Sequence, residues 1–204
     1  MSNPEENGNG TRADLGFNKV LFTMKNGKTV LENSCHLFIE DRDCERVIVV
    51  TKEKVNFTSS KVRVVPGGKR RCNSVYHGLK CAQNDFVFIH DGVRPFLSKI
   101  DLEKLKEAIK RNDGAILAHP AIETVKYVNN RIISKTINRD NVFCAMTPQA
   151  FKTSLIKKVY EKADLTSDIT DDASIFEKAG YKVRIVCGSK RNIKLTNKED
   201  FEDI

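Results

Sequence analysis

The sequence has no long apolar run, and its first ten residues, MSNPEENGNG, lack the basic start and the apolar centre of a secretory signal. A helix that spans a bilayer needs about 20 consecutive, mostly apolar residues. No segment of the 204 residues approaches that length. We therefore expect a cytoplasmic protein that does not bind a membrane.

Closely spaced pairs of cysteine or histidine are also missing. The six cysteines form no C-x-x-C pair, and the four histidines are equally dispersed. Because zinc sites draw on ligands a few residues apart, this pattern argues against a zinc site. We expect reduced, partly buried thiols, with a catalytic thiol as the less favoured alternative. The cysteines are Cys35, Cys44, Cys72, Cys81, Cys144 and Cys187.

The charge of the chain is strongly basic, with a net value of +8 at pH 7. Such an excess attracts anions, either nucleic acid or small phosphorylated metabolites. The basic residues are spread along the chain, with the densest cluster at residues 69–71. No basic ribbon interleaved with aromatic residues stands out, so a small phosphorylated ligand is favoured over nucleic acid.

Strand-like runs alternate with segments of helical spacing. The strand-like runs are residues 46–51, 61–65, 86–90, 114–119 and 181–187. The helical segments are residues 29–40, 99–110, 150–163 and 168–179. In the last of these we expect Thr170 as the N-cap, with Asp171 and Asp172 serving the first turn. The alternation predicts one α/β domain over residues 1–204 with a mostly parallel sheet.

One segment interrupts this alternation. Residues 124–137, TVKYVNNRIISKTI, have the pattern of two strands joined by Asn129 and Asn130. An apolar hairpin that projects from an α/β domain needs a partner to cover it. We therefore interpret residues 122–145 as a β-arm for dimerisation.

The segment FVFIHDGVRPF, residues 86–96, passes from an apolar run directly into charge. A continuous apolar run is typical of a strand buried on both faces, and ligands of open α/β sheets bind at the carboxyl ends of strands. Asp91 and Arg94 are therefore candidates for ligand binding. The alternative is a salt bridge between them that only ties down the loop. His90 is expected to be a core histidine that donates to the backbone.

Two glycine-containing segments could present backbone amides to an anion. The first, NGNGTRADLGFNKV, begins at Asn7 and includes Arg12 and Lys19; its alternative reading is a flexible basic tail. The second, VVPGGKRRCNSVYHGL, follows a strand and places Ser74 in the first turn of the next helix.

An ordered set of segments that covers nearly the whole chain resembles the 2-C-methyl-D-erythritol 4-phosphate cytidylyltransferase family. The resemblance implies a Rossmann-like nucleotidyltransferase fold with a projecting β-arm for homodimerisation. It also implies magnesium-dependent transfer of a cytidylyl group from CTP to a sugar-alcohol phosphate, with release of pyrophosphate. The segments are GNGTR, NK, PGGKRRCNSVYHGL, HDGVRPF, ETVK, INRD, TPQAF, TDDASI and GSKRNIKLT.

The same resemblance implies roles for individual residues. The implied catalytic residues are Arg12, Lys19, Lys194 and Arg139, the last reaching in from the partner subunit's arm. The implied nucleotide-binding residues are Gly8, Gly10, Thr11, Gly68, Lys69, Ser74 and Gly92. The implied acceptor-binding residues are Asp91, Arg94, Thr124, Thr147 and Thr170. Asp91 would also ligate magnesium together with the CTP phosphates, and Thr147 has the alternative role of a helix cap.

The start of the chain departs from the family pattern. Where the family has a buried apolar strand, this chain has SNPEENGNG, so we expect the first strand of the fold to be missing or altered. Two other functions stay open on this reading. The acceptor could be ribitol 5-phosphate, or the protein could be a catalytically impaired nucleotide-binding or scaffold homologue.

Overall fold

Two sheets form the centre of the computed structural model, which describes residues 16–204. The smaller sheet pairs β1 (Val47–Thr51) with β2 (Val62–Pro66) in parallel. The larger sheet has the order β3-β7-β4-β8. Its strands are β3 (Phe86–Ile89), β7 (Phe143–Lys152), β4 (Gly114–Pro120) and β8 (Val183–Cys187). The predicted α/β class is confirmed. The expected change in the family's first strand falls on residues outside those described.

The larger sheet is mostly parallel, as expected: β3, β4 and β8 run in the same direction, and β7 is the exception. Strand β8 pairs with β4 in parallel, but β7 runs antiparallel to both β3 and β4. The reason is the path of the chain, which leaves the sheet after Pro120 and returns through β7 in the opposite direction. Residues 150–152 consequently belong to a strand and not to the helix predicted over 150–163.

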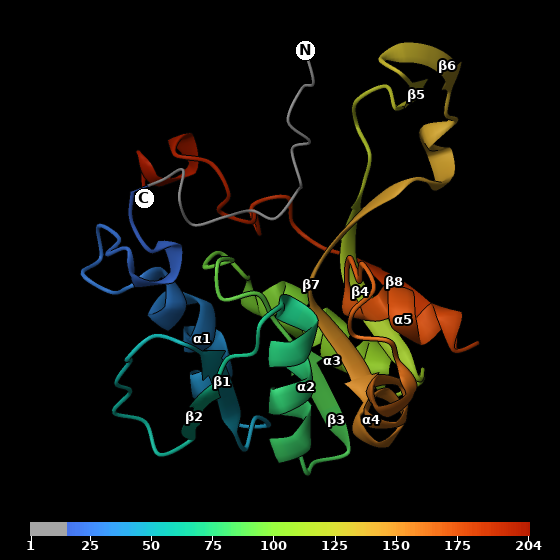
Figure 1. The fold of residues 1–204 in the computed structure, drawn as a ribbon. Helices are drawn as coiled ribbons and strands as arrows, with labels where there is room; N and C mark the ends of the chain where they lie inside the picture. The colour runs from blue at the N-terminus through green and yellow to red at the C-terminus, as the bar shows by residue number, and fades with distance from the viewer. Residues whose placement is uncertain (1–15) are drawn as a thin grey trace.

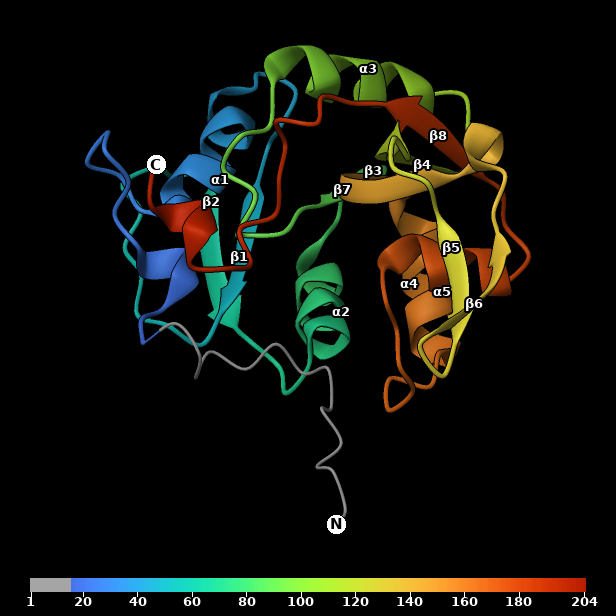
Figure 2. The same cartoon turned by 90° about the horizontal axis from the view of Figure 1, so that it is seen from above.

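Helices cover both faces of the larger sheet, as Figure 2 shows. Helix α3 packs on one face, and α4 and α5 pack on the other. Helix α2 packs on the smaller sheet and against α4, and α1 lies beside β1. The helices are α1 (Val30–Glu40), α2 (Arg71–Cys81), α3 (Lys99–Ile109), α4 (Thr153–Lys162) and α5 (Asp172–Lys178).

The N-terminus of α5 differs from the predicted one. The cap is Asp171, whose carboxylate accepts a hydrogen bond of 2.9 Å from the backbone N–H of Ser174. Thr170 therefore lies one residue before the cap, and the helix is shorter than the predicted 168–179. Asp171 serves the helix as expected, whereas the side chain of Asp172 is fully buried and has other partners.

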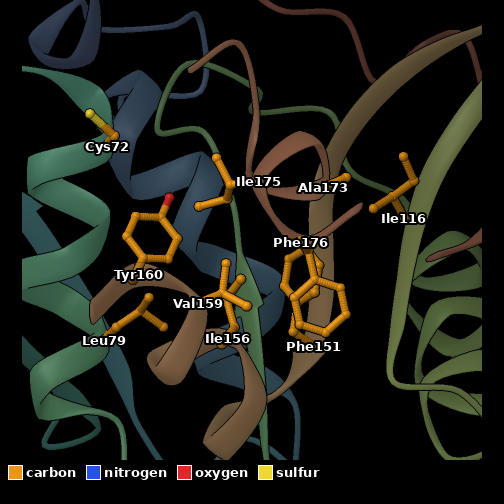
Figure 3. Close-up of a cluster of buried hydrophobic side chains, with 10 residues drawn as sticks. All are labelled: Cys72, Leu79, Ile116, Phe151, Ile156, Val159, Tyr160, Ala173, Ile175 and Phe176. Atoms are coloured by element: carbon orange, nitrogen blue, oxygen red, sulfur yellow. The ribbon is translucent and has the colours of Figure 1, made fainter. Parts of the chain in front are cut away.

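The largest hydrophobic cluster lies between the larger sheet and helices α2, α4 and α5 (Figure 3). Phe151 of β7 contacts Phe176 of α5, with ring centroids 4.9 Å apart. Tyr160 of α4 is also almost completely buried there, although it carries a hydroxyl group. This cluster holds α2 and α5 at fixed positions beside the sheet.

The predicted hairpin is present and stands away from both sheets (Figure 1). Strands β5 (Lys126–Asn129) and β6 (Ile132–Thr136) pair antiparallel. The turn consists of Asn130 and Arg131, one residue later than predicted, and both have positive φ, 49° and 63°. Positive φ at both central residues is typical of the tight turn that suits the twist of a hairpin.

The C-terminal segment crosses from β8 to the N-terminal part of the described chain. There, η4 (Glu199–Phe201) packs Phe201 against Phe17 and Phe22, close to η2 (Lys19–Leu21). On the way, the backbone N–H of Leu195 donates to the carbonyl of Val93 at 2.9 Å. This bond fixes the segment beside the loop that follows β3. In the described part of the chain, no helix is long and apolar enough to cross a membrane.

Candidate active site

A single carboxylate with three cationic neighbours stands in the loop after β3. Asp91 Oδ1 lies 3.0 Å from Arg71 Nε, and its Oδ2 lies 3.3 Å from Lys194 Nζ and 3.5 Å from Arg94 Nε. We call these four residues the Asp91 cluster. They come from the first residue of α2, the β3 loop and the C-terminal segment, so the fold gathers them from three parts of the chain.

The Asp91 carboxyl is ionised at neutral pH. Burial alone would raise its pKa, but the charge of Arg71, followed by that of Lys194, outweighs burial and lowers the pKa to about 2. The side chain of Lys194 is 44% exposed, whereas that of Asp91 is 11% exposed. The cluster therefore offers positive charge at its open side and a fixed negative charge below it.

A chain of hydrogen bonds fixes the Asp91 loop from inside. The backbone N–H of Asp91 donates to Thr147 Oγ1 at 3.0 Å, and Thr147 Oγ1 lies 3.1 Å from His90 Nδ1. His90 Nε2 lies 3.0 Å from the carbonyl oxygen of Arg94, which can only accept. These partners assign the proton to Nε2 and leave Nδ1 to accept from the Thr147 hydroxyl.

His90 is neutral in this arrangement, because burial lowers its pKa to about 4. It donates to a backbone carbonyl, as expected from the sequence. Thr147 lies inside β7 and is not a helix cap. Its hydroxyl is used by His90 and Asp91, and its role as an acceptor ligand stays a prediction.

Arg94 connects the Asp91 loop to the C-terminal segment. Its guanidinium donates to the carbonyl of Asn192 at 2.8 Å, and the amide of Asn192 donates to the carbonyl of Thr147 at 2.7 Å. The salt bridge between Asp91 and Arg94, which was the alternative to ligand binding, is present. It is only one of several contacts that Arg94 makes. Arg94 Nε faces the Asp91 carboxylate at 3.5 Å, whereas Asn192 Oδ1 is, among the described residues, buried without a hydrogen-bond partner.

Sequence reasoning missed Arg71. The arginine appeared only as part of the basic cluster at residues 69–71, yet its Nη2 lies 2.7 Å from Asp172 Oδ2 while its Nε contacts Asp91. Arg71 and Asp172 are 101 residues apart in the chain. No local pattern pairs two residues at that separation, so only the fold identifies this contact.

The second glycine segment forms a tight loop before α2. The backbone N–H of Gly68 donates to Ser74 Oγ at 2.9 Å, and a Cβ at Gly68 would lie 2.4 Å from the Cβ of Asn73. Only glycine fits so close an approach. An open hollow of about 380 Å³ lies at this loop. It is lined by Lys52, Gly67, Gly68, Lys69, Asn73 and His77.

Two further predicted residues lie near the cluster. Gly92 belongs to the Asp91 loop, and Lys19 contacts the C-terminal segment. The carbonyl of Gly92 accepts from Ser34 Oγ at 3.1 Å, and Lys19 Nζ donates to the carbonyl of Thr196. Lys19 is therefore brought to the segment that carries Lys194. The predicted binding residues Gly8, Gly10, Thr11 and Arg12 lie outside the described residues.

The remaining predicted residues are exposed and lie elsewhere in this chain. Thr124 and Arg139 belong to the arm, where the guanidinium of Arg139 contacts the carbonyl of Ile122. Thr170 is exposed immediately before α5. Within residues 16–204, none of the three makes a hydrogen bond or ion pair with the Asp91 cluster.

This fold, with lysine and arginine side chains gathered beside a glycine loop, defines an α/β enzyme of the nucleotidyltransferase class. Residues 6–203 match the family model described as 2-C-methyl-D-erythritol 4-phosphate cytidylyltransferase. The chain belongs to this family, and the resemblance found in the sequence is confirmed.

Relatives with this name cover almost the whole chain. The protein from Petrotoga mobilis is 41% identical, in an alignment that covers 96% of this chain and 92% of that protein. The protein from Halalkalibacterium halodurans is 36% identical, covering 95% and 90%. The crystal structure of the Francisella tularensis cytidylyltransferase matches with a TM-score of 0.82 and 35% identity, covering 91% of each chain. The chain is thus a cytidylyltransferase of isoprenoid biosynthesis.

Proposed function

We propose that this enzyme transfers the cytidylyl group of CTP to 2-C-methyl-D-erythritol 4-phosphate at the Asp91 cluster. A phosphate oxygen of the acceptor attacks the α-phosphorus of CTP, and the bond between the α-phosphorus and the bridging oxygen breaks. Pyrophosphate leaves with that electron pair, and the product contains a new diphosphate linkage. The observation that carries the proposal is the gathering of Arg71, Arg94 and Lys194 around one ionised carboxylate.

The task of the protein in this reaction is to hold two anions together. Phosphoryl-type transfer needs positioning and charge neutralisation more than covalent chemistry from the protein. Lys194, at the open side of the cluster, would contact the α-phosphate, and Lys19 would stabilise the triphosphate from the neighbouring segment. Arg12 would act with Lys19. The loop of Gly68, with Lys69, Ser74 and Gly92, would border the nucleoside.

The acceptor would lie on the Asp91 side of the cluster. Asp91 would bind acceptor hydroxyl groups, while Arg94 offers a planar guanidinium suited to phosphate. Thr147 and Thr170 would flank the same side, from β7 and from the residue before the α5 cap. The pairing of Asp91 with Arg94 places a hydroxyl-binding group beside a phosphate-binding group, as a phosphorylated polyol requires.

Magnesium would neutralise charge on the triphosphate when it is bound. Within residues 16–204, no group of three or more His, Cys, Asp or Glu side chains could hold a metal ion. The residues therefore fit an ion that is held mainly by phosphate oxygens and water, as Mg²⁺ usually is. The ionised Asp91 offers one oxygen ligand to such an ion.

The active unit would be a homodimer formed through the β5–β6 arm. The arm exposes apolar side chains that a monomer would leave in water, and a second copy of the chain would cover them. The same contact would bring Thr124 and Arg139 to the partner's acceptor site. The exposed apolar residues of the arm region are Ile122, Tyr127, Val128, Ile132, Ile133 and Phe143.

An assay of pyrophosphate release from CTP and Mg²⁺ tests the proposal. We expect rapid release with 2-C-methyl-D-erythritol 4-phosphate and little with ribitol 5-phosphate. Preference for ribitol 5-phosphate would overturn the acceptor assignment but keep the reaction. Absence of both CTP binding and turnover would indicate the scaffold alternative. A cytoplasmic location stays a prediction.

A further inference from the structure

Arg71 bridges two carboxylates that belong to different parts of the fold. Its Nε lies 3.0 Å from Asp91 Oδ1, and its Nη2 lies 2.7 Å from Asp172 Oδ2. Arg71 is the first residue of α2, which follows the glycine loop, and Asp172 is the first residue of α5. The guanidinium thus connects the nucleotide-side loop, the Asp91 loop and the helix that follows Thr170.

The Asp172 end of this bridge is rigid. The side chain of Asp172 has no exposed surface, and Tyr160 donates its hydroxyl to the other carboxylate oxygen. Tyr160 in turn is packed between α2 and α5 in the cluster of Figure 3. A buried carboxylate is costly unless its partners are in place. Asp172 therefore holds one edge of the guanidinium in a single orientation.

A fixed guanidinium orients the carboxylate on its other edge. With Nη2 bound to Asp172, Nε of Arg71 points at Asp91 Oδ1, and Oδ2 is left for Lys194 and Arg94. We propose that Arg71 is a positioning residue for the transfer reaction: it sets the orientation of Asp91, using Asp172 and Tyr160 as its support. The inference depends on the proposed role of Asp91 in the acceptor site.

Lysine cannot replace Arg71 in this role. Its ammonium group is a point charge on a flexible stem, whereas the planar fork contacts two carboxylates at once. Arg71→Lys keeps the charge beside Asp91 but loses the defined geometry. A misplacement of about 1 Å can reduce a rate by about 100-fold. We therefore expect Arg71→Lys to lower kcat by about 10- to 100-fold, with the KM for CTP changed less than about twofold.

A kinetic double-mutant cycle with Asp91→Asn separates positioning from bracing. If Arg71 acts through Asp91, Arg71→Lys should change kcat by less than about twofold in the Asp91→Asn background. Radiolabelled CTP keeps slow variants measurable. An equal loss in both backgrounds would overturn the inference, because Arg71 would then act independently of Asp91. Wild-type kcat in the single Arg71→Lys variant would overturn it as well.

Controls distinguish failure of the inference from failure of the protein. Arg63→Lys makes the same change at an exposed arginine of β2 and should leave kcat and the melting temperature unchanged. Wild-type enzyme without turnover would refute the proposed function itself, independently of Arg71.

If Arg71→Lys does not fold, Tyr160→Phe removes only the hydroxyl that supports Asp172. We then expect kcat to fall about two- to fivefold with an unchanged KM for CTP, because one supporting hydrogen bond is lost, and an unchanged kcat would refute the support role.

Discussion

The Asp91 cluster and the β5–β6 arm are opposite kinds of surface. In the cluster each charged group faces a partner of opposite sign within the same chain, and Asp91 is 11% exposed. In the arm every residue of both strands is exposed, including Ile132 at 72% and Ile133 at 60%. The cluster is complete in one chain except for its ligands, whereas the arm has no apolar partner in the described residues.

We therefore expect the two regions to depend on different parts of the assembly: the cluster depends on the fold of one chain, and the arm depends on a second molecule. The geometry of the cluster depends on the fold, because Arg71, Lys194 and Asp91 come from three distant segments. The arm is a two-stranded hairpin, which is at best marginally stable in water on its own. Its order should depend on a second molecule. The enzyme should therefore respond to substitutions in the cluster through the rate, and to substitutions in the arm through association.

The largest effect is expected from the two lysines. Removal of one charge that stabilises a transition state typically lowers kcat by about 100- to 1,000-fold. Lys194→Ala and Lys19→Ala should each fall in this range, while the melting temperature changes little because Lys194 is exposed and Lys19 is only half-buried. Lys190→Ala, at an exposed position of the same segment, is the control. Steady-state kinetics with wild-type kcat in either variant would remove that lysine from the mechanism.

A smaller effect is expected from the arm. Covering an exposed isoleucine side chain removes apolar surface from water and is worth about 1.5 kcal/mol, so Ile132→Ser with Ile133→Ser should weaken the dimer by roughly 10- to 100-fold. Sedimentation should show monomer, and activity should fall in proportion to its fraction. Ile100→Ser makes the same change at an exposed isoleucine of α3 and should have no effect on assembly. A fully active monomer would contradict the role of the arm.

The local elements of the fold could be predicted, because they depend on periodicity. Helix α1 and strands β1 to β4 lie within about two residues of their predicted ranges. Asp91 and Arg94 could also be identified as candidate binding residues, because they directly follow the apolar run that forms β3. The resemblance to the family then supplied Lys194, which no local pattern connects to Asp91.

The parts that could not be predicted depend on partners distant in sequence. Strand β7 contains Thr147, Pro148 and Gln149, which do not form an apolar run, yet all three are buried by β3, β4 and α5. The pairing of Arg71 with Asp172 likewise depends on the tertiary fold. The one-residue error in the arm turn arose because Asn129 and Asn130 fit the turn equally well by residue type.

The neutral state of His90 predicts how stability varies with pH. Its pKa is lowered from 6.5 to about 4 in the fold, so the unfolded chain binds more protons between these values. The contribution to unfolding free energy is present above pH 6.5 and is lost as the pH falls toward 4. We expect a loss of about 2 kcal/mol between pH 7 and pH 5. In His90→Gln the unfolding free energy should change less between pH 7 and pH 5. Urea titrations at both pH values measure this change, and an equal change in both proteins would contradict the assignment.

The smallest effect concerns the turn of the arm. Arg131 adopts a φ of 63°, a conformation that is strained by about 1 kcal/mol for a residue with a side chain. Arg131→Gly removes the strain but increases the freedom of the unfolded chain, so the hairpin should gain only about 0.5 kcal/mol. Hydrogen exchange of the β5 and β6 amides measures this local stability, whereas the melting temperature should not move.

The control for Arg131→Gly is Ser134→Gly, which introduces glycine inside strand β6 instead of in the turn. Glycine within a strand is destabilising by roughly 0.5–1 kcal/mol. The two variants should shift arm exchange in opposite directions. The experiment also sharpens the contrast with the Asp91 cluster. If the arm is ordered by a second molecule, its exchange should slow as protein concentration rises, and the effect of Arg131→Gly should be largest in dilute samples. Exchange that is fast at every concentration in both variants would mean that neither the turn nor a partner orders the arm.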